Sequence, residues 1–376
     1  MNIANRRIED TSDLLLQLQS EGLRIESEGE SALYRKGGAG PSDHKAVNIG
    51  GSTIMVPVYN FHSKSSTFWA NKPNELGVST LYRKSIKIGS LTFPRQPNFY
   101  SKETSDGIPL WKIATLHSKD VLATTVLQNC VRYNDKATSC QFCAIGESLK
   151  ANMTIAYKKP NHLAEVAKAA VELDGVTQFV MTTGTPNTED RGAAILLESV
   201  VAVREVVDIP IQVQCEPPND FRWFQKLRDS GADGIGMHIE AATQSTRSKI
   251  MPGKAKVDLA YYDEAFKAAV YVFGKAQVST YILAGLGDTP SQIINKSLNL
   301  IEMGVYPFVV PFVPIAGTPL EHLPSPSSSF MKPILRIIGG KLHEAGMTSD
   351  VVKAGCAKCG ACSTLKSFEK KETLHY

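Results

Sequence analysis

Three cysteines that follow a strand-like run at residues 121–128 are the residues most capable of chemistry. Cys130, Cys140 and Cys143 form the pattern C-x9-C-x2-C, with Phe142 beside the last thiol. Thiolates are the usual ligands of iron–sulfur clusters. Three of them on one loop can hold a [4Fe–4S] cluster and leave one iron open to a ligand that is not protein. We call these residues the loop triad.

A second group of cysteines lies near the end of the chain. Cys356, Cys359 and Cys362 have the spacing C-x2-C-x2-C, which ferredoxins use for three ligands of a [4Fe–4S] cluster. This C-terminal triad therefore predicts a second, auxiliary [4Fe–4S] cluster. Two zinc interpretations stay open: a zinc site with a fourth ligand elsewhere, or a zinc ribbon made from Cys140/Cys143 and Cys356/Cys359. The ribbon would leave Cys130 and Cys362 without a role.

Composition and charge exclude several function classes. The 376 residues contain seven cysteines, an odd and mostly clustered set that favours thiolate ligands in a reducing compartment over disulfides. A net charge of +4 is too small to indicate nucleic-acid binding. The longest apolar stretches, such as residues 305–315, are too short to span a bilayer, and the N-terminus has no apolar core of the signal-peptide type. We expect a cytoplasmic protein that binds neither nucleic acid nor membrane.

The elements that must position these thiols alternate regularly after residue 111. Strands are predicted at residues 123–128, 178–183, 209–216, 234–240, 278–283 and 305–313. Helices are predicted between and after them, at residues 160–173, 193–207, 220–229, 259–273, 291–302 and 331–344. This alternation predicts an α/β fold, a partial (β/α)6 TIM-type barrel with its chemistry at the C-terminal ends of the strands. We expect three parts: a β-rich extension at 1–112 with a short helix at 11–22, the barrel at 113–325, and a C-terminal helix and cysteine segment at 326–376.

Polar residues at the predicted strand ends are the candidate site. Gln214 and Glu216 share one face of a strand, and Cys215 points to the other. A carboxylate at a barrel mouth suits a ribose diol or an ammonium group, although a structural role for Glu216 is the alternative. Cys215 is either a small buried hydrophobic residue or a ligand or hydrogen-atom donor. His238 shares a face with Glu240 and could reach a substrate, or it could be a core histidine.

The loop triad followed by strand–helix units resembles the radical S-adenosylmethionine (SAM) superfamily. Residues 236–254 and the sequence Gly317-Thr318-Pro319-Leu320 resemble its biotin-synthase-like and lipoyl-synthase-like members, and the resemblance covers roughly residues 120–325. The usual spacing of the superfamily is C-x3-C-x2-C, so the first gap is longer here. Tripling a loop of this size costs about 1 kcal/mol of closure entropy. Thiolate–metal binding, at roughly 10 kcal/mol or more for structural zinc, exceeds that cost.

The resemblance implies that the open iron of the loop-triad cluster binds SAM, and that an electron from a flavodoxin or ferredoxin-type donor cleaves SAM to a 5′-deoxyadenosyl radical. It also implies that Glu240 lines the SAM or substrate pocket and that Arg247 holds a carboxylate. From their positions we predict His238, Glu240 and Cys215 as the catalytic residues. The residues expected to bind SAM are Phe142, Thr182, Thr183, Gly184, Gln214, Glu216, Glu240, Arg247, Gly285 and Val313.

The overall layout and a glycine-rich loop at residues 36–45 also resemble an uncharacterised radical SAM family found alongside nitrilases in bacterial gene clusters. That loop is either an anion-binding nest or a plain turn. The expected reaction is hydrogen abstraction from a small carboxylate-bearing substrate, with sulfur insertion or a rearrangement or cleavage as the outcome. Two alternatives stay open: SAM cleavage to an aminocarboxypropyl radical, and a zinc-stapled binding protein without redox chemistry.

Overall fold

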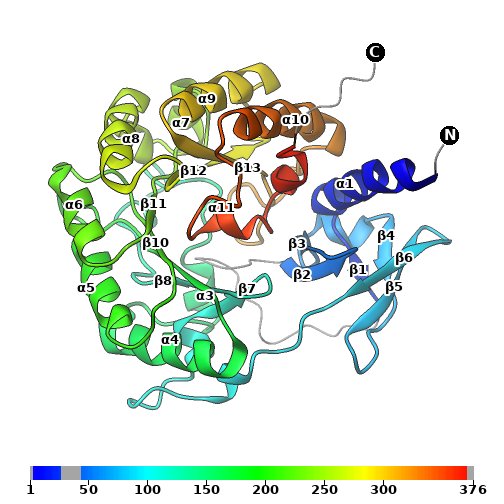
Figure 1. Ribbon diagram of the computed structural model, residues 1–376, viewed down its shortest axis with the longest axis horizontal. Coiled ribbons are helices and arrows are strands. Elements are labelled where there is room, and N and C mark those ends of the chain that lie inside the picture. Colours follow the sequence, from blue (N-terminus) through cyan, green and yellow to red (C-terminus); the bar gives the residue numbers. More distant parts are fainter. Residues whose placement is uncertain (1–2, 27–43, 371–376) are drawn as a thin grey trace.

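Two β-sheets organise the computed structural model, which describes residues 3–26 and 44–370. The first sheet has six strands in the order β1-β4-β5-β6-β2-β3 and is covered by helix α1, Ile3–Glu21 (Figure 1). Leu15 and Leu18 of this helix are buried in one cluster with Val56 and Phe68 of the sheet. The strands are β1, Arg24–Ile25; β2, His44–Ile49; β3, Ser52–Pro57; β4, Phe68–Ala70; β5, Val78–Arg83; and β6, Ile86–Thr92. This is the β-rich N-terminal part.

The second sheet has seven strands in the order β13-β12-β11-β10-β9-β8-β7. Strands β8 to β13 pair in parallel, and β7 pairs with β8 in an antiparallel hairpin. Helices lie outside the curved sheet in Figure 1. The strands are β7, Thr115–His117; β8, Val121–Thr125; β9, Gln178–Thr182; β10, Ile211–Gln214; β11, Gly234–Gly236; β12, Val278–Ala284; and β13, Val305–Pro311.

Each parallel strand is followed by a helix, and this confirms the predicted (β/α)6 partial barrel. The α-helices after α1 are α2, Leu110–Ile113; α3, Glu147–Lys150; α4, Pro160–Asp174; α5, Ala193–Arg204; α6, Arg222–Asp229; α7, Gln244–Ile250; α8, Leu259–Phe273; α9, Pro290–Glu302; α10, Ser328–Glu344; and α11, Cys356–Cys359. The 3₁₀ helices are η1, His62–Ser65; η2, Asn98–Ser101; η3, Lys254–Lys256; and η4, Thr364–Phe368. In the described residues, no helix combines the length and apolarity needed to cross a bilayer.

Local sequence explains where these helices begin. Helix α9 starts with a capping box, in which the Thr289 side chain accepts from the Gln292 N–H and the Gln292 side chain accepts from the Thr289 N–H. Pro290 occupies the first turn, where its missing N–H has no intrahelical partner to lose. Helix α8 is capped by Asp258, which accepts from the N–H of Tyr261. These short-range signals explain why the element pattern is readable from sequence.

The C-terminal segment, residues 349–363, lies inside the open barrel, with α11 near the centre of Figure 1. Glutamines of the barrel hold its backbone. The Oε1 of Gln178 accepts from the Gly355 N–H at 2.7 Å, and Gln277 binds both the Val351 carbonyl and the Lys353 N–H. These glutamines are at most 8% exposed, so their amide groups are satisfied by the segment rather than by water.

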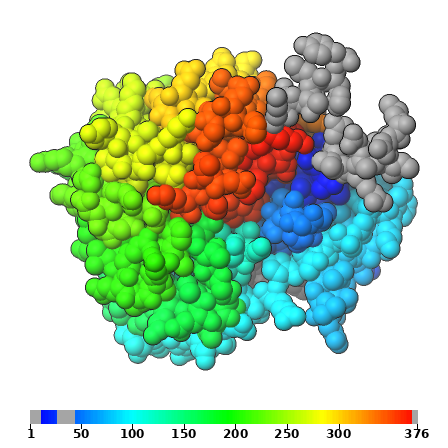
Figure 2. Space-filling model, in the orientation of Figure 1, coloured from blue at the N-terminus to red at the C-terminus, as the bar shows by residue number. Residues whose placement is uncertain are grey.

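The same segment joins the two edges of the open sheet. The Ser363 hydroxyl donates to the Val309 carbonyl of β13 at 2.6 Å, while Cys362 contacts His117 of β7. The N-terminal part closes over it, because Met55 N and Gln19 Nε2 both donate to the Ala361 carbonyl, at 2.8 and 3.0 Å. Figure 2 shows the C-terminal region in red against the blue N-terminal part on one side and the green barrel on the other. The cysteine segment therefore fills the open barrel and connects its two edge strands with the N-terminal part.

Candidate functional site

Both cysteine triads line one cavity of about 450 Å³. Its wall also contains Thr182–Thr185, Gln214 and Glu216 at the C-terminal ends of β9 and β10, and residues of the N-terminal part. The cysteines of the cavity and the polar residues around them include His117, Cys130, Arg132, Cys140, Cys143, Glu216, His238, Glu240, Lys254, Tyr281, Cys356, Cys359 and Cys362. Two sets of three cysteines, separated by more than two hundred residues in the sequence, thus share a single site.

Backbone contacts with the barrel fix the loop that carries the loop triad. The N–H of Val131 donates to the Thr185 carbonyl at 2.8 Å, and the N–H of Gln141 donates to the Ile250 carbonyl at 2.9 Å. Gly184 permits the closest approach, since a Cβ there would lie 1.8 Å from the Asn129 carbonyl oxygen. The loop is therefore held against the C-terminal end of β9, where parallel strands place their functional groups, and against the end of α7.

Two ion pairs lie beside the loop triad. Arg132 pairs with Oε1 of Glu216, which also accepts from the Thr185 hydroxyl at 2.8 Å. The Oε2 of Glu216 is buried and has no hydrogen-bond partner among the described residues. Lys254 lies 2.7–2.8 Å from the two carboxylate oxygens of Glu240. Burial lowers the pKa of Lys254, but the acidic groups around it, Glu240 foremost, together outweigh burial, so the net shift is upward and the ammonium stays charged.

Glu240 has an unusual backbone for its residue type. Its φ of 57° lies in the left-handed region, which non-glycine residues adopt rarely and often at functional sites. Its N–H donates to the Tyr281 carbonyl and its carbonyl accepts from the Leu283 N–H, so two backbone bonds to β12 hold the conformation. The strained turn directs the carboxylate toward the cavity and Lys254.

His238 is a neutral acceptor in this site. Its Nδ1 accepts from the backbone N–H of Tyr281 at 3.2 Å, and its ring meets the Tyr281 ring edge-on at 4.8 Å. Burial, with Lys254 nearby, lowers the pKa of His238 to about 3. The imidazole is thus uncharged near neutral pH and available for hydrogen bonding toward the cavity.

The side chains that contact the C-terminal triad are neutral instead, and Asp120, which acts on Cys359, is the charged group nearby. Gln214 Nε2 donates to the Cys356 sulfur at 3.4 Å, and His117 Nε2 lies 3.3 Å from the Cys362 sulfur. Tyr281 interacts with the thiols of Cys356 and Cys362. Ser118 interacts with Cys359 and has a φ of 61°, a strained value that places its hydroxyl at the triad. Each thiol therefore has at least one uncharged polar neighbour.

The thiols fit the role of metal ligands. Burial raises the pKa of Cys143 to about 11 and of Cys359 to about 12, and burial together with Glu240 raises the pKa of Cys140 well above its usual value. Burial opposes the charged thiolate even with Lys254 nearby, and bonding to iron would offset that cost. Two sets of three such thiols on one cavity fit the donor sets of [4Fe–4S] clusters.

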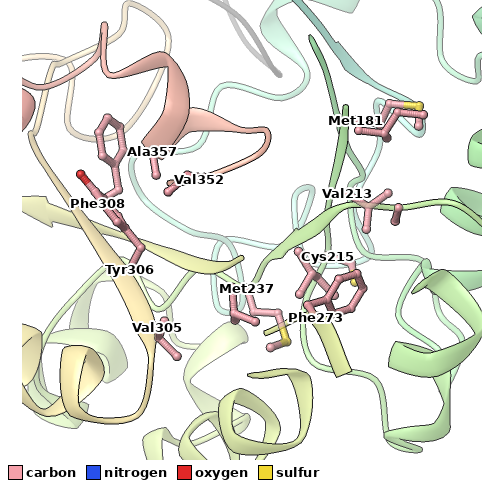
Figure 3. Packing of buried hydrophobic residues seen from close by; sticks show 14 of the residues in the cluster. Met181, Val213, Cys215, Met237, Phe273, Val305, Tyr306, Phe308, Val352 and Ala357 are labelled. Atoms are coloured by element: carbon pink, nitrogen blue, oxygen red, sulfur yellow. The ribbon is translucent and has the colours of Figure 1, made fainter. Parts of the chain in front are cut away.

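The structure brings most of the predicted site residues together and leaves a few outside. The residues that line the cavity are Phe142, Thr182, Thr183, Gly184, Gln214, Cys215, Glu216, His238 and Glu240. Gln214 faces the C-terminal triad, with its amide donating to Gln212 and Cys356. Cys215 contributes to the wall, but its side chain belongs to the hydrophobic core, as Figure 3 shows beside Met237 and Phe273. Burial raises the pKa of its thiol to about 12.

Three residues expected to bind SAM do not line this cavity. Arg247 is fully buried; its Nη1 donates to the Val257 carbonyl at 2.9 Å, and its guanidinium stacks 4.8 Å from the Tyr262 ring. Gly285 and Val313 also lie outside the lining residues. At Gly285 the φ of 105° accounts for the glycine. The glycine-rich loop at 36–45 lies outside the described residues except for its last two positions, of which His44 lines the cavity.

Four of the lining residues that contact the triads or their ion pairs were not predicted as site residues: His117, Arg132, Lys254 and Tyr281. Arg132 and Lys254 lie within segments that the motifs covered, and a basic residue two positions after Cys130 was a usable signal. Tyr281 reads as an ordinary strand residue. His117 gave no signal, because its three-residue strand β7 is too short to predict and its partner Cys362 is distant in sequence.

Comparison with known proteins agrees with this site. Residues 134–295 match the family model described as the radical SAM superfamily, a match that begins just after Cys130. A curated relative, bacteriochlorophyllide c C-7(1)-hydroxylase of Chlorobaculum limnaeum, is 26% identical over 251 residues, which cover 61% of this chain and 62% of the relative. The chain thus spans about three fifths of that relative's length. These matches confirm the predicted resemblance to the radical SAM superfamily and support an enzyme of that type.

Solved structures of similar arrangement include a methylornithine synthase, with a TM-score of 0.45, 18% identity, and coverage of 64% of this chain and 71% of that chain. A radical SAM methyltransferase from Sphaerobacter thermophilus has a TM-score of 0.46 and 14% identity over 61% of this chain and 66% of that chain. A radical SAM domain at residues 134–295 implies a [4Fe–4S] cluster and SAM as cofactors. The biotin-synthase-like branch and the nitrilase-associated family stay predictions.

Proposed function

We propose that this enzyme binds SAM at a [4Fe–4S] cluster held by Cys130, Cys140 and Cys143 and abstracts hydrogen from a small substrate. The observation that carries the proposal is that these three thiols share a cavity with polar groups from the ends of β9, β10 and β11. When bound, the cluster and SAM would supply a 5′-deoxyadenosyl radical after one-electron reduction by a flavodoxin or ferredoxin-type donor. The chain's own residues bind and orient the reactants.

Glu216 is the best-placed group for a cationic or hydroxylated part of SAM. One of its carboxylate oxygens is engaged by Arg132 and Thr185, which fixes the side chain, whereas Oε2 is buried without a partner in the described residues. A buried carboxylate oxygen without a donor is costly, and an ammonium or ribose hydroxyl would satisfy it. Thr182 and Thr183 line the same cavity.

The ion pair of Lys254 with Glu240 is the proposed contact for a carboxylate. Arg247, which the sequence favoured for this role, is buried behind the lining. Lys254 is the cation nearest the Glu240 turn and is held charged there, so it can bind a carboxylate of SAM or of the substrate. Arg132 is the second basic lining side chain, but its pairing with Glu216 assigns it to the SAM side.

The volume of the cavity favours a small substrate. Pockets for drug-sized ligands range from about 300 to 1,000 Å³, and this one measures about 450 Å³ before any cofactor enters. A hydroxylase replaces a C–H bond, so the relative from Chlorobaculum limnaeum is consistent with hydrogen abstraction. The substrate proposed here is small, and the bacteriochlorophyllide in the relative's name is not carried over to this chain.

An anaerobic assay tests the proposal. The reconstituted protein is treated with dithionite and SAM, and the SAM fragments are analysed. We expect 5′-deoxyadenosine; 5′-methylthioadenosine without it would indicate the aminocarboxypropyl radical, and neither product with tightly bound zinc would indicate the zinc-stapled protein. With substrate, loss of iron and sulfide from the C-terminal triad during turnover would support sulfur insertion, and an intact cluster would support rearrangement or cleavage.

A further inference from the structure

The C-terminal triad has a polar environment that a purely structural metal site does not require. Three residues from different barrel strands converge on two sulfur atoms: His117 of β7 on Cys362, Gln214 of β10 on Cys356, and Tyr281 of β12 on both. His117 and Gln214 are buried, with 8% and 6% exposure, and all three residues line the cavity. They are therefore fixed and face the same space as the loop triad.

The direction of the His117 contact follows from the chemistry of the sulfur. A thiolate bound to iron has no proton and can only accept, so the proton of the imidazole must be on Nε2, the atom 3.3 Å from the Cys362 sulfur. The opposite ring atom, Nδ1, is buried and has no partner in the described part of the chain. As an acceptor without a proton it is the less costly atom to leave unpaired, so this tautomer is self-consistent.

The distance also argues against His117 as a ligand of a cubane. Ligand atoms bound to different irons of one cluster lie far apart, because two metal–ligand bonds and the metal–metal distance separate them. A nitrogen 3.3 Å from a ligand sulfur is instead at ordinary N–H···S hydrogen-bond distance. The side chain of Gln214 is held in place by further hydrogen bonds. Its Nε2 also donates to the Gln212 Oε1 at 2.8 Å, and Gln212 Nε2 donates to Ser279 at 3.1 Å.

The loop triad has a different environment. The thiol of Cys143 receives a backbone N–H from Ile145, and the nearby side chains are the ion pairs of Arg132 with Glu216 and of Lys254 with Glu240. Each pair carries no net charge. Hydrogen bonds to cluster sulfurs stabilise the additional negative charge of the reduced state, which raises the reduction potential.

Building on the proposed function, we propose that His117, Gln214 and Tyr281 donate hydrogen bonds to the thiolates of a [4Fe–4S] cluster in the C-terminal triad and make it the more easily reduced of the two clusters on this cavity. These are positioning residues, acting through the cysteine sulfurs. The couple is the one-electron 2+/1+ couple of each cluster.

Two triple variants separate the clusters. Replacing Cys130, Cys140 and Cys143 with alanine leaves only the C-terminal cluster, and replacing Cys356, Cys359 and Cys362 leaves only the loop-triad cluster. Each is reconstituted with iron and sulfide, reduced stepwise with dithionite, and followed by electron paramagnetic resonance. We expect the isolated C-terminal cluster to be reduced at the higher potential. The reverse order, or no iron in the protein that keeps only the C-terminal triad, overturns the inference.

His117→Leu in the protein with only the C-terminal cluster tests the hydrogen bond itself. We expect the equilibrium constant for reduction to fall about tenfold, which corresponds to about 59 mV for one electron. His117→Gln keeps an N–H donor and should recover part of the shift, which a role in packing alone would not produce. Gln214→Leu should act in the same direction through Cys356. Unchanged potentials in both leucine variants with the cluster intact, or loss of iron from both, overturn the inference.

A failure here is distinguishable from a failure of the proposed function. The unaltered enzyme would still form 5′-deoxyadenosine if the C-terminal triad bound zinc or held a cluster of low potential. Absence of that product from a protein with an intact loop-triad cluster would refute the proposed function and leave the measured potentials unaffected.

Discussion

The two cysteine triads share a cavity but are built in opposite ways. The loop triad comes from one continuous loop, held by backbone bonds to the ends of β9 and α7 and flanked by two ion pairs. The C-terminal triad comes from a segment that enters the barrel from the end of the chain and is held by uncharged glutamines, a histidine and a tyrosine. The first arrangement suits a charged ligand such as SAM, and the second suits a metal group whose ligand atoms need donors.

The largest expected effect tests whether the loop triad binds SAM and the C-terminal triad has a separate role. Cys140→Ala removes a ligand of the proposed SAM-binding cluster, and we expect 5′-deoxyadenosine formation to fall to the background of the assay. Cys359→Ala should keep most of that activity while the iron content falls by about half, because only one of two four-iron clusters is lost. Chromatography of the nucleoside and colorimetric iron analysis measure both. Lys136→Ala, in an exposed part of the same loop, is the matched control.

Equal loss of product in Cys140→Ala and Cys359→Ala would mean that the two triads act as one unit. The division proposed here would then be wrong.

The next effect concerns the charges beside the loop triad. Lys254→Met leaves the Glu240 carboxylate without its cation in a mostly buried position, with side-chain exposures of 11% and 13% in the pair. Removing one partner of such a pair costs about 3 kcal/mol or more. We expect the free energy of unfolding in urea to fall by about that amount and the affinity for SAM to weaken. Lys249→Met, at an exposed position nearby, should change stability by less than about 0.5 kcal/mol.

If Lys254→Met caused loss of iron from the C-terminal triad and left SAM binding unchanged, the ion pair would support the C-terminal triad and not the loop triad. Our assignment of the pair would then be wrong.

A smaller effect is expected at the entry of the C-terminal segment. A Cβ on Gly355 would lie 2.2 Å from the Gln212 side chain, and its φ of 106° is unfavourable for other residues. Gly355→Ala should therefore destabilise the protein by about 1–3 kcal/mol and reduce iron in the C-terminal triad. Gly346→Ala has a positive φ of 63° but no atom within 4 Å, so it separates backbone strain from the clash.

Thermal unfolding and iron analysis compare these two glycine variants. Equal iron loss in both would show that the contact with Gln212 does not position the triad.

The smallest effect is a pH dependence at His238. Because its pKa is about 3 in the folded protein and about 6.5 when unfolded, the unfolded state binds more protons between those values. Stability is thus fully present above pH 6.5 and decreases as the pH falls below it. One such histidine contributes at most about 1.4 kcal/mol per pH unit. His238→Gln, which keeps an acceptor for the Tyr281 N–H, should reduce the slope by that amount in urea titrations from pH 6.5 to 4.5. An unchanged slope would show that His238 titrates normally.

Sequence reasoning predicted the barrel well because its signals are local. The strand at residues 278–283 corresponds to β12, Val278–Ala284, and the helix at 259–273 coincides with α8, since periodicity and caps such as Asp258 act within a few residues. The strand ends were less accurate: residues 234–240 were expected to be one strand, but β11 ends at Gly236. Beyond it the chain turns through the strained Glu240, which no propensity signals.

The candidate site was predictable where residue type and position in a motif coincide, as for the six clustered cysteines, Thr182, Gly184 and Glu216. Arg247 shows the limit, because an arginine after a strand end can face a ligand or be buried, and only packing against Tyr262 and Val257 decides. For that reason we propose Lys254, and not Arg247, as the residue that binds a carboxylate.

By itself the sequence determined the chemistry of the thiols, the alternation of strands and helices, and the resemblance to the superfamily. These features depend on ligand type and short-range periodicity, which residues close together in the sequence specify. Only the tertiary structure decided that the C-terminal triad lies in the same cavity as the loop triad, with His117 against Cys362 across 245 positions. Contacts of that range depend on how the open barrel is filled and closed. Local spacing does not encode that packing.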